Sequence, residues 1–546
     1  MPAYALRPCV TALALLLLPP LCGGFFGLSA SGPPRARATH RPAMVASGSS
    51  QYATGESVPL FYDRAGAQSG AASDADAYRR PLRVMIAGGG IGGLCAALVL
   101  RNSGYDVQVF EKATEYKPFG GPIQIATNAL ESLVRIDRGV YDEIIAASTK
   151  IGDRRNGLKD GISSEWFATF DLLSPAKARS AEASIVIDRP VLQDILLSRV
   201  GDCVTVGKEV VAYEQALKAD APVIGVLADG SRVEADVLIG SDGIRSKVRS
   251  QLVDLKDPVW SGYTCFAAIA NVVPDDIKDV GYKVFLGSRK YFVSVDVGGG
   301  RIQWYAFLNI PPRSLKLEPS EMCAWLKETQ FSDWSPEVHQ LLDNTPVTQV
   351  EQRDLYDRAP ELKWVNGRVA LLGDAAHPMM PNLGQGGGMA IEDALVLGQE
   401  LRRIGDINAV PLALTKYNRN RALRAAAVQG MSRLSSAILF QYNHPTTLEA
   451  PAGGGLPRLK NFGPRSVITR ACQGFLQRVA FPLQFEFLFS FPGRAVDPEV
   501  FERPSPGDFV ADAAQREGPK KRGVAEETLF KRPEGMSLRD WFEQYW

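Results

Sequence analysis

The sequence has few of the residues that build metal centres and covalent cross-links. It contains 7 cysteines and 4 histidines among 546 residues. The cysteines form no CxxC pair, and the histidines do not recur at the spacing of metal ligands. Because structural zinc sites and disulfide frameworks depend on such patterns, we expect neither in this protein, and no metal site.

An excess of charge of either sign is also missing. The formal net charge is +1, from 61 lysines and arginines against 60 aspartates and glutamates. A protein with such a balance has no overall positive charge to attract the phosphates of nucleic acid, so we expect no nucleic-acid partner. The hydrophobic fraction of 45% is ordinary for a soluble globular protein, and the length allows more than one structural unit.

Acidic residues are absent from 25–55, where serine, alanine, proline and arginine are frequent. The preceding apolar run, 10–18, follows Arg7 and is too short for a transmembrane helix. We interpret 1–24 as a signal peptide and 25–80 as a transit peptide with a linker. This leader resembles the bipartite leaders of algae with complex plastids, and ordinary secretion is the alternative.

The first folded segment has the pattern of a dinucleotide-binding unit. A short apolar strand is expected over 82–87, a helix over 94–103 and an alternating strand over 105–111. Between the first strand and the helix, glycines occupy the first, third and sixth positions of a GxGxxG motif. These glycines are Gly88, Gly90 and Gly93, with a further glycine at Gly92.

Each position of this motif has a mechanical role. Gly88 allows the turn, Gly90 lets a pyrophosphate approach, and Gly93 lets the helix pack closely on the strand. Glu111 closes the second strand, and its carboxylate can accept hydrogen bonds from an adenosine ribose. An acid here favours an unphosphorylated ribose, as in FAD or NAD, without choosing between the two.

Two later turns each place an acid directly after a buried strand. The first contains Asp242 and Gly243, and the second contains Gly373 and Asp374. Arg249 lies beyond the first turn, where it can pair with Asp242 or another acid. A short acid beside a tight turn suits a polar group held close to the backbone.

The second turn leads into a glycine-rich loop and a helix expected over 389–402. The loop contains Pro381, Gly384, Gly386 and Gly387. A run of glycines before a helix start suits a flat or anionic ligand that touches main-chain N–H groups.

Several other residues have more ordinary interpretations. Arg189 stands at the start of an expected helix, where a surface cation is the common outcome. His377 lies in the second turn and is expected to form structural hydrogen bonds. A long helix expected over 412–429 contains Arg419, Arg421 and Arg424 on or near one face, and we favour a solvated basic face for them.

Aromatic and β-branched residues are dense in the extended segments of 260–308, which predicts a sheet. Its aromatic side chains are either core or the wall of an apolar substrate pocket. Apolar stretches at 438–440, 476–481 and 483–489 are either interfacial, facing lipid, or packed on the back of the domain.

The GxGxxG loop with its acid, the Asp242 turn and the Asp374 turn with its glycine loop stand in one order along 81–425. This order resembles the class A flavoprotein monooxygenases, which share the para-hydroxybenzoate hydroxylase fold. Within that class, segments such as 121–125, 261–265 and 303–307 are similar to the zeaxanthin epoxidases of plants and algae.

The resemblance implies an α/β fold, with a Rossmann-like FAD-binding domain interleaved with a β-sheet substrate domain. The FAD-binding parts are expected at about 81–120, 185–255 and 353–425, and the substrate parts at 121–184 and 256–352. A C-terminal helical extension is expected at 426–493, with membrane contact as one alternative for it, and a tail is expected at 494–546. That tail is too short for the forkhead-associated domain of plant members, so we expect a form without it.

The resemblance also implies roles for single residues. Glu111 would hold the adenosine ribose, and Arg189 would contact the cofactor. Asp242 and Gly243 would lie beside the pyrophosphate, and Asp374 on the ribityl chain or its adjoining ribose and phosphate. The other implied FAD contacts are Gly88, Gly90, Gly92, Gly93, Gly373, Pro381, Gly384, Gly386 and Gly387. No catalytic acid or base is implied.

The implied activity is epoxidation of the β-rings of a xanthophyll such as zeaxanthin, through a flavin C4a-hydroperoxide. O₂ would be the co-substrate, and NAD(P)H or reduced ferredoxin the electron source. The implied location is a plastid, with peripheral association with the thylakoid. Two alternatives stay open: a related monooxygenase that hydroxylates an aromatic or another polyene, and a non-catalytic FAD- or carotenoid-binding protein.

Overall fold

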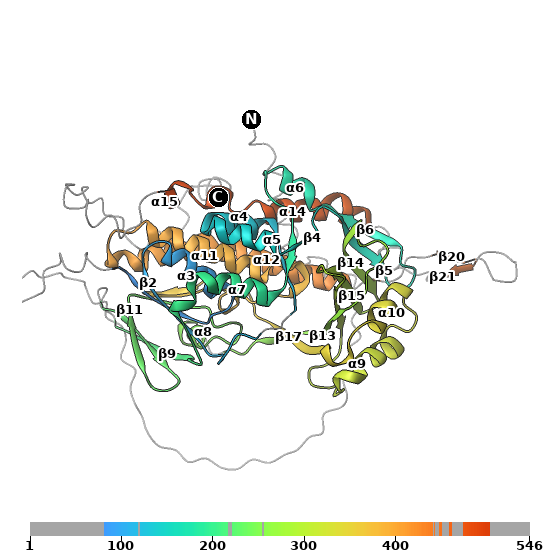
Figure 1. Ribbon diagram of the computed structural model, residues 1–546, viewed down its shortest axis with the longest axis horizontal. Coiled ribbons are helices and arrows are strands. Elements are labelled where there is room, and N and C mark those ends of the chain that lie inside the picture. The colour runs from blue at the N-terminus through green and yellow to red at the C-terminus, as the bar shows by residue number, and fades with distance from the viewer. Residues whose placement is uncertain are drawn as a thin grey trace, which may run out of the picture.

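The computed structural model describes residues 81–117, 121–216, 221–253, 256–440, 442, 447–449, 458–460 and 473–502. The expected leader, 1–80, and most of the expected tail lie outside these residues. In Figure 1, α11 (Gly386–Arg402) and α12 (Val410–Phe440) run along the middle of the molecule. A large sheet with short flanking helices occupies one end, and the expected dinucleotide-binding unit lies at the other.

The dinucleotide-binding unit is built on a six-stranded sheet. Its strand order is β18 (Val365–Asn366), β19 (Val369–Leu371), β12 (Val237–Gly240), β1 (Arg83–Ala87), β2 (Asp106–Glu111) and β8 (Val204–Val206). All neighbours pair in parallel except β18 and β19. The inner strands are continuous apolar runs because both faces of the sheet are covered. Helix α3 (Ile91–Arg101) packs on β1 and β2. On the other face lies β10 (Val223–Leu227), where a Cβ at Gly225 would be 2.3 Å from the Met85 Sδ. The expected Rossmann-like sheet is therefore confirmed.

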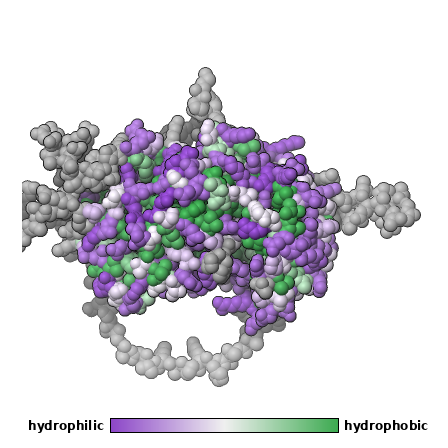
Figure 2. Space-filling view, in the orientation of Figure 1, coloured by the Kyte–Doolittle hydropathy of each residue, from purple (hydrophilic) through white to green (hydrophobic). Residues whose placement is uncertain are grey.

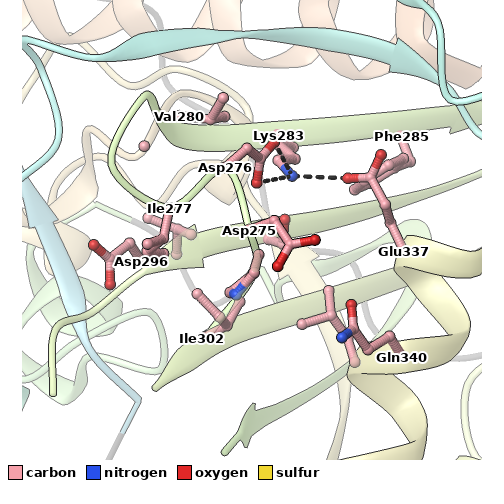
Figure 3. Close-up of a pocket in the computed structure, with 15 residues that line it drawn as sticks. Asp275, Asp276, Ile277, Val280, Lys283, Phe285, Asp296, Ile302, Glu337 and Gln340 are labelled. Atoms are coloured by element: carbon pink, nitrogen blue, oxygen red, sulfur yellow. Dashed lines mark hydrogen bonds and ion pairs between the residues drawn. The ribbon is translucent and has the colours of Figure 1, made fainter. Parts of the chain in front are cut away.

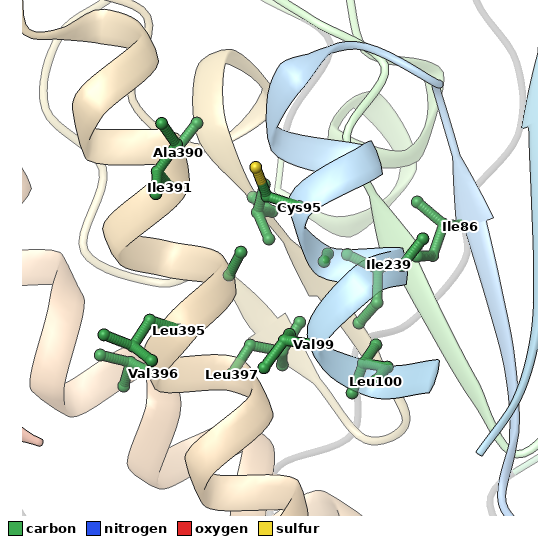
Figure 4. Packing of buried hydrophobic residues seen from close by; sticks show 14 of the residues in the cluster. Ile86, Cys95, Val99, Leu100, Ile239, Ala390, Ile391, Leu395, Val396 and Leu397 are labelled. Atoms are coloured by element: carbon green, nitrogen blue, oxygen red, sulfur yellow. The ribbon is translucent and has the colours of Figure 1, made fainter. Parts of the chain in front are cut away.

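The long helices pack against this sheet and against one another. Helix α3 (Ile91–Arg101) lies beside α11, and Cys95 and Val99 of α3 share a buried core with Leu395 of α11 (Figure 4). Gly398 permits the close approach, since a Cβ there would lie 2.6 Å from the Val99 side chain. The same core takes in α4 (Thr127–Ile136), α5 (Arg138–Ala146), α7 (Arg189–Val200) and α8 (Lys247–Leu252).

Two helices are longer than their sequence patterns predicted. Helix α11 begins at Gly386 and not at Met389, because the loop glycines form its first turn. Helix α12 runs from Val410 to Phe440, beyond the predicted end at 429, so it links the two ends of the molecule.

The other end is a seven-stranded sheet. Its order is β17 (Glu351–Asp357), β13 (Val259–Ala270), β16 (Ile302–Leu308), β15 (Lys290–Asp296), β14 (Val280–Gly287), β5 (Arg155–Asp160) and β6 (Trp166–Phe170). The sheet predicted over 260–308 is thus confirmed. One face packs on α9 (Pro319–Trp325), a π-helical turn (Leu326–Gln330) and α10 (Pro336–Asp343), where Phe292, Trp304 and Phe331 are buried.

Smaller elements complete the fold. They are the sheet of β9 (Val210–Gln215), β10 (Val223–Leu227) and β11 (Arg232–Ala235); the sheet of β3 (Ile123–Ile125), β7 (Ile185–Ile187) and β4 (Thr149–Lys150); α6 (Leu173–Lys177); and the β20 (Thr447–Glu449) and β21 (Arg458–Lys460) pair.

The C-terminal elements are η7 (Leu476–Ala480), α14 (Phe481–Phe489) and α15 (Glu499–Glu502). Helix α14 packs on the body of the protein, because Leu488 and Phe489 are buried and Phe485 lies 5.4 Å from Phe170 between ring centroids. For α14, packing is therefore the correct alternative. Among the described helices, none has both the length and the apolar character needed to cross a bilayer.

Candidate cofactor and substrate site

The three predicted turns meet at one edge of the six-stranded sheet. Gly88 follows β1, Asp242 follows β12 and Asp374 follows β19, and these strands are adjacent and parallel. The carboxyl ends of parallel strands lie at the same edge, where open α/β sheets bind their ligands. The turns are more than 280 residues apart along the chain at the extremes, and the sheet brings them together.

Gly92 marks the point where the turns touch. A Cβ at Gly92 would lie 2.8 Å from the Leu372 side chain, 2.9 Å from the Ala390 Cβ and 3.7 Å from the Ser241 Oγ. These three neighbours belong to the second turn, to α11 and to the first turn. Gly92 therefore packs the start of α3 against the other two motifs.

The glycine loop after β1 has the geometry that its motif predicts. Gly88 has a φ of +101°, and a Cβ there would lie 2.4 Å from the Ser241 carbonyl oxygen. A Cβ at Gly93 would lie 2.0 Å from the Gly88 carbonyl oxygen. Gly90 differs, because a Cβ there would meet no atom within 4 Å. Open space therefore lies in front of the N-terminus of α3, which is the place a pyrophosphate would need.

Glu111 lies at the end of β2, beside this loop. Its carboxylate accepts hydrogen bonds from the Gly89 N–H at 2.7 Å and from the Ala113 N–H at 2.9 Å. The side chain thus braces the glycine loop. A carboxylate has about four lone-pair sites, so lone pairs stay available for a ribose diol.

Asp242 closes the turn after β12. One oxygen, Oδ2, accepts hydrogen bonds from the Lys247 N–H at 2.7 Å and the Val248 N–H at 3.3 Å, at the start of α8. The other oxygen, Oδ1, is buried and accepts no hydrogen bond. Burial raises the pKa of Asp242, and the hydrogen bonds oppose that rise. Gly243 beside it has a φ of +80°.

Arg249 joins the first turn to the second. Its Nη1 donates to the carbonyl oxygens of Ala375 at 3.1 Å and Ala376 at 2.9 Å, next to Asp374. The sequence suggested that this arginine can pair with an acid; the two hydrogen bonds described here hold the backbone of the second turn. The outcome is physically reasonable because both carbonyls are buried and need donors.

Asp374 projects from the short 3₁₀ turn Gly373–Ala375. Its side chain is solvent-exposed, and it accepts no hydrogen bond from the described part of the chain. Enough protein surrounds the carboxylate to raise its pKa by desolvation, while the nearby His377 and Arg189 act in the opposite direction. An unpartnered carboxylate beside a glycine loop can accept hydrogen bonds from hydroxyl groups of a ligand.

Arg189 is the first residue of α7 and is exposed. It lies close enough to lower the pKa of Asp374 and that of Tyr305. The structure therefore brings this cation near the second turn.

The loop 381–387 faces β3. Gly384 has a φ of +61°, and a Cβ there would lie 3.1 Å from the Gln124 Oε1. A Cβ at Gly387 would lie 2.8 Å from the Ile123 Cδ1, and one at Gly386 would lie 4.0 Å from the Asp374 Oδ1. Pro381 opens the short turn (Pro381–Leu383) ahead of these glycines. The N-terminus of α11 and the Asp374 carboxylate therefore border the same space.

A buried ionic network lies beneath the loop, and the sequence patterns did not reveal it. Arg421 of α12 donates to Glu392 at 2.5 Å and to Asp393 at 2.7 Å, and all three side chains are fully buried. Arg424 also donates to Glu392, at 2.8 Å. The solvated basic face predicted for Arg421 and Arg424 is therefore wrong, since both arginines neutralise acids of α11.

His377 belongs to the same network. Its Nε2 lies 2.6 Å from the Asp393 Oδ2, which also accepts the Gly373 N–H at 3.0 Å. The ring is fully buried. His377 thus has the structural hydrogen-bonding role that we expected, and Asp393 fixes the backbone of the second turn.

An aromatic cluster of the seven-stranded sheet, formed by Tyr291, Tyr305 and Phe307, adjoins the loop. The ring of Tyr291 stacks on Phe307 at 4.4 Å, and the Tyr291 hydroxyl accepts a hydrogen bond from the Asn382 Nδ2 at 3.0 Å. Tyr305 lies next to Phe307 and donates to the Pro122 carbonyl at 3.4 Å. The loop 381–387, the segment 121–125 and the sheet therefore meet at one place.

A separate cavity of about 260 Å³ lies on another part of this sheet, against α10 (Figure 3). Lys283 lies there between Asp276 and Glu337, at 2.8 Å and 2.7 Å. The positive charge of Lys283 is thus already paired with two carboxylates of the cavity. None of the predicted site residues lines it.

The contrast between Gly90 and Gly93 gives a testable prediction. Gly90→Ala is expected to weaken FAD binding at least tenfold, because its methyl group would enter the space before α3, while stability changes by less than about 1 kcal/mol. Gly93→Ala is expected to destabilise the fold, because its Cβ would overlap the Gly88 carbonyl. Flavin fluorescence titration and thermal unfolding measure both. Wild-type FAD affinity in Gly90→Ala would contradict the prediction.

Comparisons with known proteins agree with this geometry. The chain is 41% identical over 410 residues to "Zeaxanthin epoxidase, chloroplastic" of Spinacia oleracea, which covers 72% of this chain and 58% of the relative. The protein of the same name from Arabidopsis thaliana is 42% identical over 393 residues, covering 70% of this chain and 56% of the relative. The chain thus spans less than two thirds of the length of these relatives.

Solved structures show the same fold. HpxO of Klebsiella pneumoniae, complexed with FAD and uric acid, has a TM-score of 0.64 and 26% identity, over 75% of this chain and 97% of that chain. A salicylate hydroxylase substrate complex has a TM-score of 0.60 and 22% identity, over 77% and 98%. The family model of the FAD binding domain matches residues 81–280 and 325–432, which include all three turns and the glycine loop. The chain therefore belongs to the FAD binding domain family.

Proposed function

We propose that this protein is an FAD-dependent monooxygenase that epoxidises the β-rings of a xanthophyll such as zeaxanthin. The observation that carries the proposal is the aromatic cluster of Tyr291, Tyr305 and Phe307, which the Asn382–Tyr291 hydrogen bond joins to the glycine loop. Tyr291 and Phe307 are buried, and Tyr305 is partly exposed. The Tyr305 ring therefore stands beside the loop as an apolar side chain on which a flat polyene ring can pack next to a flavin. The relatives named zeaxanthin epoxidase support the choice of substrate.

The residues present fit FAD. In the proposed complex the pyrophosphate lies before α3 at Gly90, and Glu111 binds the adenosine ribose. Asp242 lies in the turn beside the same region, and Asp374 would accept hydrogen bonds from ribityl or ribose hydroxyls. Arg189 adds a positive charge beside Asp374. The N-terminus of α11 borders the flavin ring.

Bound FAD, once reduced, supplies the activation of O₂. One oxygen atom enters the ring double bond of the substrate and the other leaves as water. The two electrons come from NAD(P)H or from two reduced ferredoxins; of the two protons, NAD(P)H brings one within its hydride and solvent supplies the other, whereas with ferredoxin solvent supplies both. The chain itself positions the double bond, excludes water and holds the cofactor. No side chain is required as a nucleophile.

The proposal is tested by supplying the FAD-loaded protein with zeaxanthin in lipid micelles, O₂, and either NADPH or reduced ferredoxin with its reductase. Chromatography should detect antheraxanthin first and violaxanthin later. Flavin oxidation without either product, for both electron donors and for a panel of xanthophylls, would overturn the proposal. Products from an aromatic substrate such as salicylate would favour the hydroxylase alternative.

We further propose that the protein acts in a plastid, at the surface of the thylakoid membrane. The relatives are named chloroplastic, and a xanthophyll is held in membranes. Three apolar side chains near the aromatic cluster are exposed and form a candidate membrane-contact surface: Ile438 is 41% exposed, Phe475 50% and Val479 40%. Their neighbours Leu439, Leu476 and Phe481 pack on the cluster that contains Tyr291. Hydrophilic side chains cover much of the face seen in Figure 2.

Replacing Phe475 and Val479 with aspartate is expected to lower sedimentation with liposomes of thylakoid lipids severalfold, because charged groups resist insertion into the interface. Activity on a water-soluble substrate analogue should not change. Leu412→Asp is the control for this change. Leu412 is also an exposed apolar residue, and it lies at the start of α12, whereas Ile438 lies near the end of that helix. Equal liposome binding by the two variants would contradict membrane contact through this surface.

A further inference from the structure

Gln385 stands between two loop glycines, directly before α11, and its side chain is only 3% exposed. Its Oε1 accepts a hydrogen bond from the Asn128 Nδ2 at 3.0 Å. The side chain makes no capping hydrogen bond to its own helix. The Gln385 Nε2 is not among the fully enclosed atoms that lack a partner, so an acceptor atom of a ligand can reach it.

The orientation of the amide follows from a chain of fixed donors and acceptors. Arg421 and Arg424 can only donate, so Glu392, which receives both, is a carboxylate acceptor. Asn128 lies 2.6 Å from the Glu392 Oε1 and must therefore present its NH₂ group there. The second hydrogen of that NH₂ group points to Gln385, so the Gln385 side chain must accept it with its oxygen, Oε1.

The Gln385 Nε2 is consequently the last donor in this series of hydrogen bonds. It cannot turn inward, because two NH₂ groups would then face one another at Asn128. Among the described residues, no acceptor forms a hydrogen bond with Nε2. The neighbouring Gly386 borders Asp374, since a Cβ there would lie 4.0 Å from the Asp374 Oδ1. The free donor thus belongs to the loop that borders the cofactor space.

We infer that the Gln385 amide is a cofactor contact that donates a hydrogen bond from Nε2 to an acceptor atom of the flavin ring, and that Asn128 is the positioning residue that orients it. The inference depends on FAD binding and not on the identity of the substrate. Reduction places negative charge on the ring acceptors, so a donor stabilises reduced flavin more than oxidised flavin. Gln385 therefore raises the reduction potential of the bound FAD.

The test is the midpoint potential of the FAD-loaded protein, measured by equilibrium dye titration. Gln385→Leu should lose roughly tenfold in the preference for reduced flavin, which lowers a two-electron potential by about 30 mV. Gln385→Glu has nearly the same shape and keeps an oxygen for Asn128, but it directs a second oxygen at the ring. Its potential should fall at least as far, which also guards against a leucine variant that does not fold.

Asn128→Leu separates orientation from general stability. It should lower the potential in the same direction as Gln385→Leu. The double variant should equal Gln385→Leu, because Asn128 is proposed to reach the flavin through Gln385 and not directly. Gln349→Leu, at an exposed glutamine, is the matched control and should keep the wild-type potential. Wild-type potentials in both Gln385 variants, or additive shifts in the double variant, would overturn the inference even if epoxidation is observed.

Discussion

Replacing Asp374 with alanine is expected to abolish FAD retention while the chain stays folded. The carboxylate is exposed and accepts no hydrogen bond from the described residues, so the fold loses no contact when it is removed. The proposed cofactor, in contrast, loses hydrogen bonds to a charged group, each of about 1.5–3 kcal/mol. FAD affinity should therefore fall on the order of a hundredfold or more.

The measurement compares the FAD content after gel filtration with the thermal unfolding of the apoprotein. Asp374→Asn keeps the shape of the side chain and should also bind FAD poorly, because the charge is lost. Asp153→Ala removes another exposed aspartate and should retain FAD. Full FAD occupancy in Asp374→Ala would refute the role of this carboxylate.

Replacing Arg421 with methionine is expected to cause the largest loss of stability, about 3–5 kcal/mol, because it leaves Asp393 and part of Glu392 buried without their cation. Asp393 also holds His377 and the Gly373 N–H, so the second turn should loosen and FAD affinity should fall as well. Denaturant unfolding of the apoprotein gives the free energy of unfolding.

Arg138→Met is the matched control for this change. Arg138 pairs with Asp142 on the surface of α5, with the arginine side chain 68% exposed, so its removal should cost less than about 1 kcal/mol. Equal stability of Arg421→Met and Arg138→Met would show that the network beneath the loop contributes little.

Local sequence patterns were enough to predict the turns of the cofactor site. Gly88 and Gly93 follow a strand and precede a helix, and a Cβ at either position would overlap the backbone. Such steric demands act over a few residues, so the sequence displays them directly. The resemblance to the monooxygenase class implied that the Gly88, Asp242 and Asp374 turns share one FAD site. In the fold they meet because parallel strands end at one edge of a sheet.

The support beneath the site could not be predicted in the same way. Arg421 and Arg424 were assigned to a solvated face because most arginines lie there. A usable signal existed: both share one face of α12 with Leu414, Tyr417 and Val428, at spacings of three and four. That apolar face should have placed the arginines inside. Their acidic partners come from α11, and pairing between separate helices depends on the assembled fold.

The orientation of Gln385 shows the same limit. A glutamine in a glycine-rich loop has no distinctive pattern in sequence. Its amide is oriented only because Asn128, far away in the chain, is itself oriented by Glu392. Hydrogen-bond chains of this kind become visible when donors and acceptors are traced through the folded structure.

The central claim is tested most directly by one turnover of the FAD-loaded protein with zeaxanthin under ¹⁸O₂, followed by mass spectrometry of the carotenoid. The account predicts antheraxanthin that carries one ¹⁸O atom in its epoxide, and violaxanthin with two after further turnover. Epoxide oxygen derived from water, or reduced FAD that returns to the oxidised state while zeaxanthin stays unchanged, would contradict it.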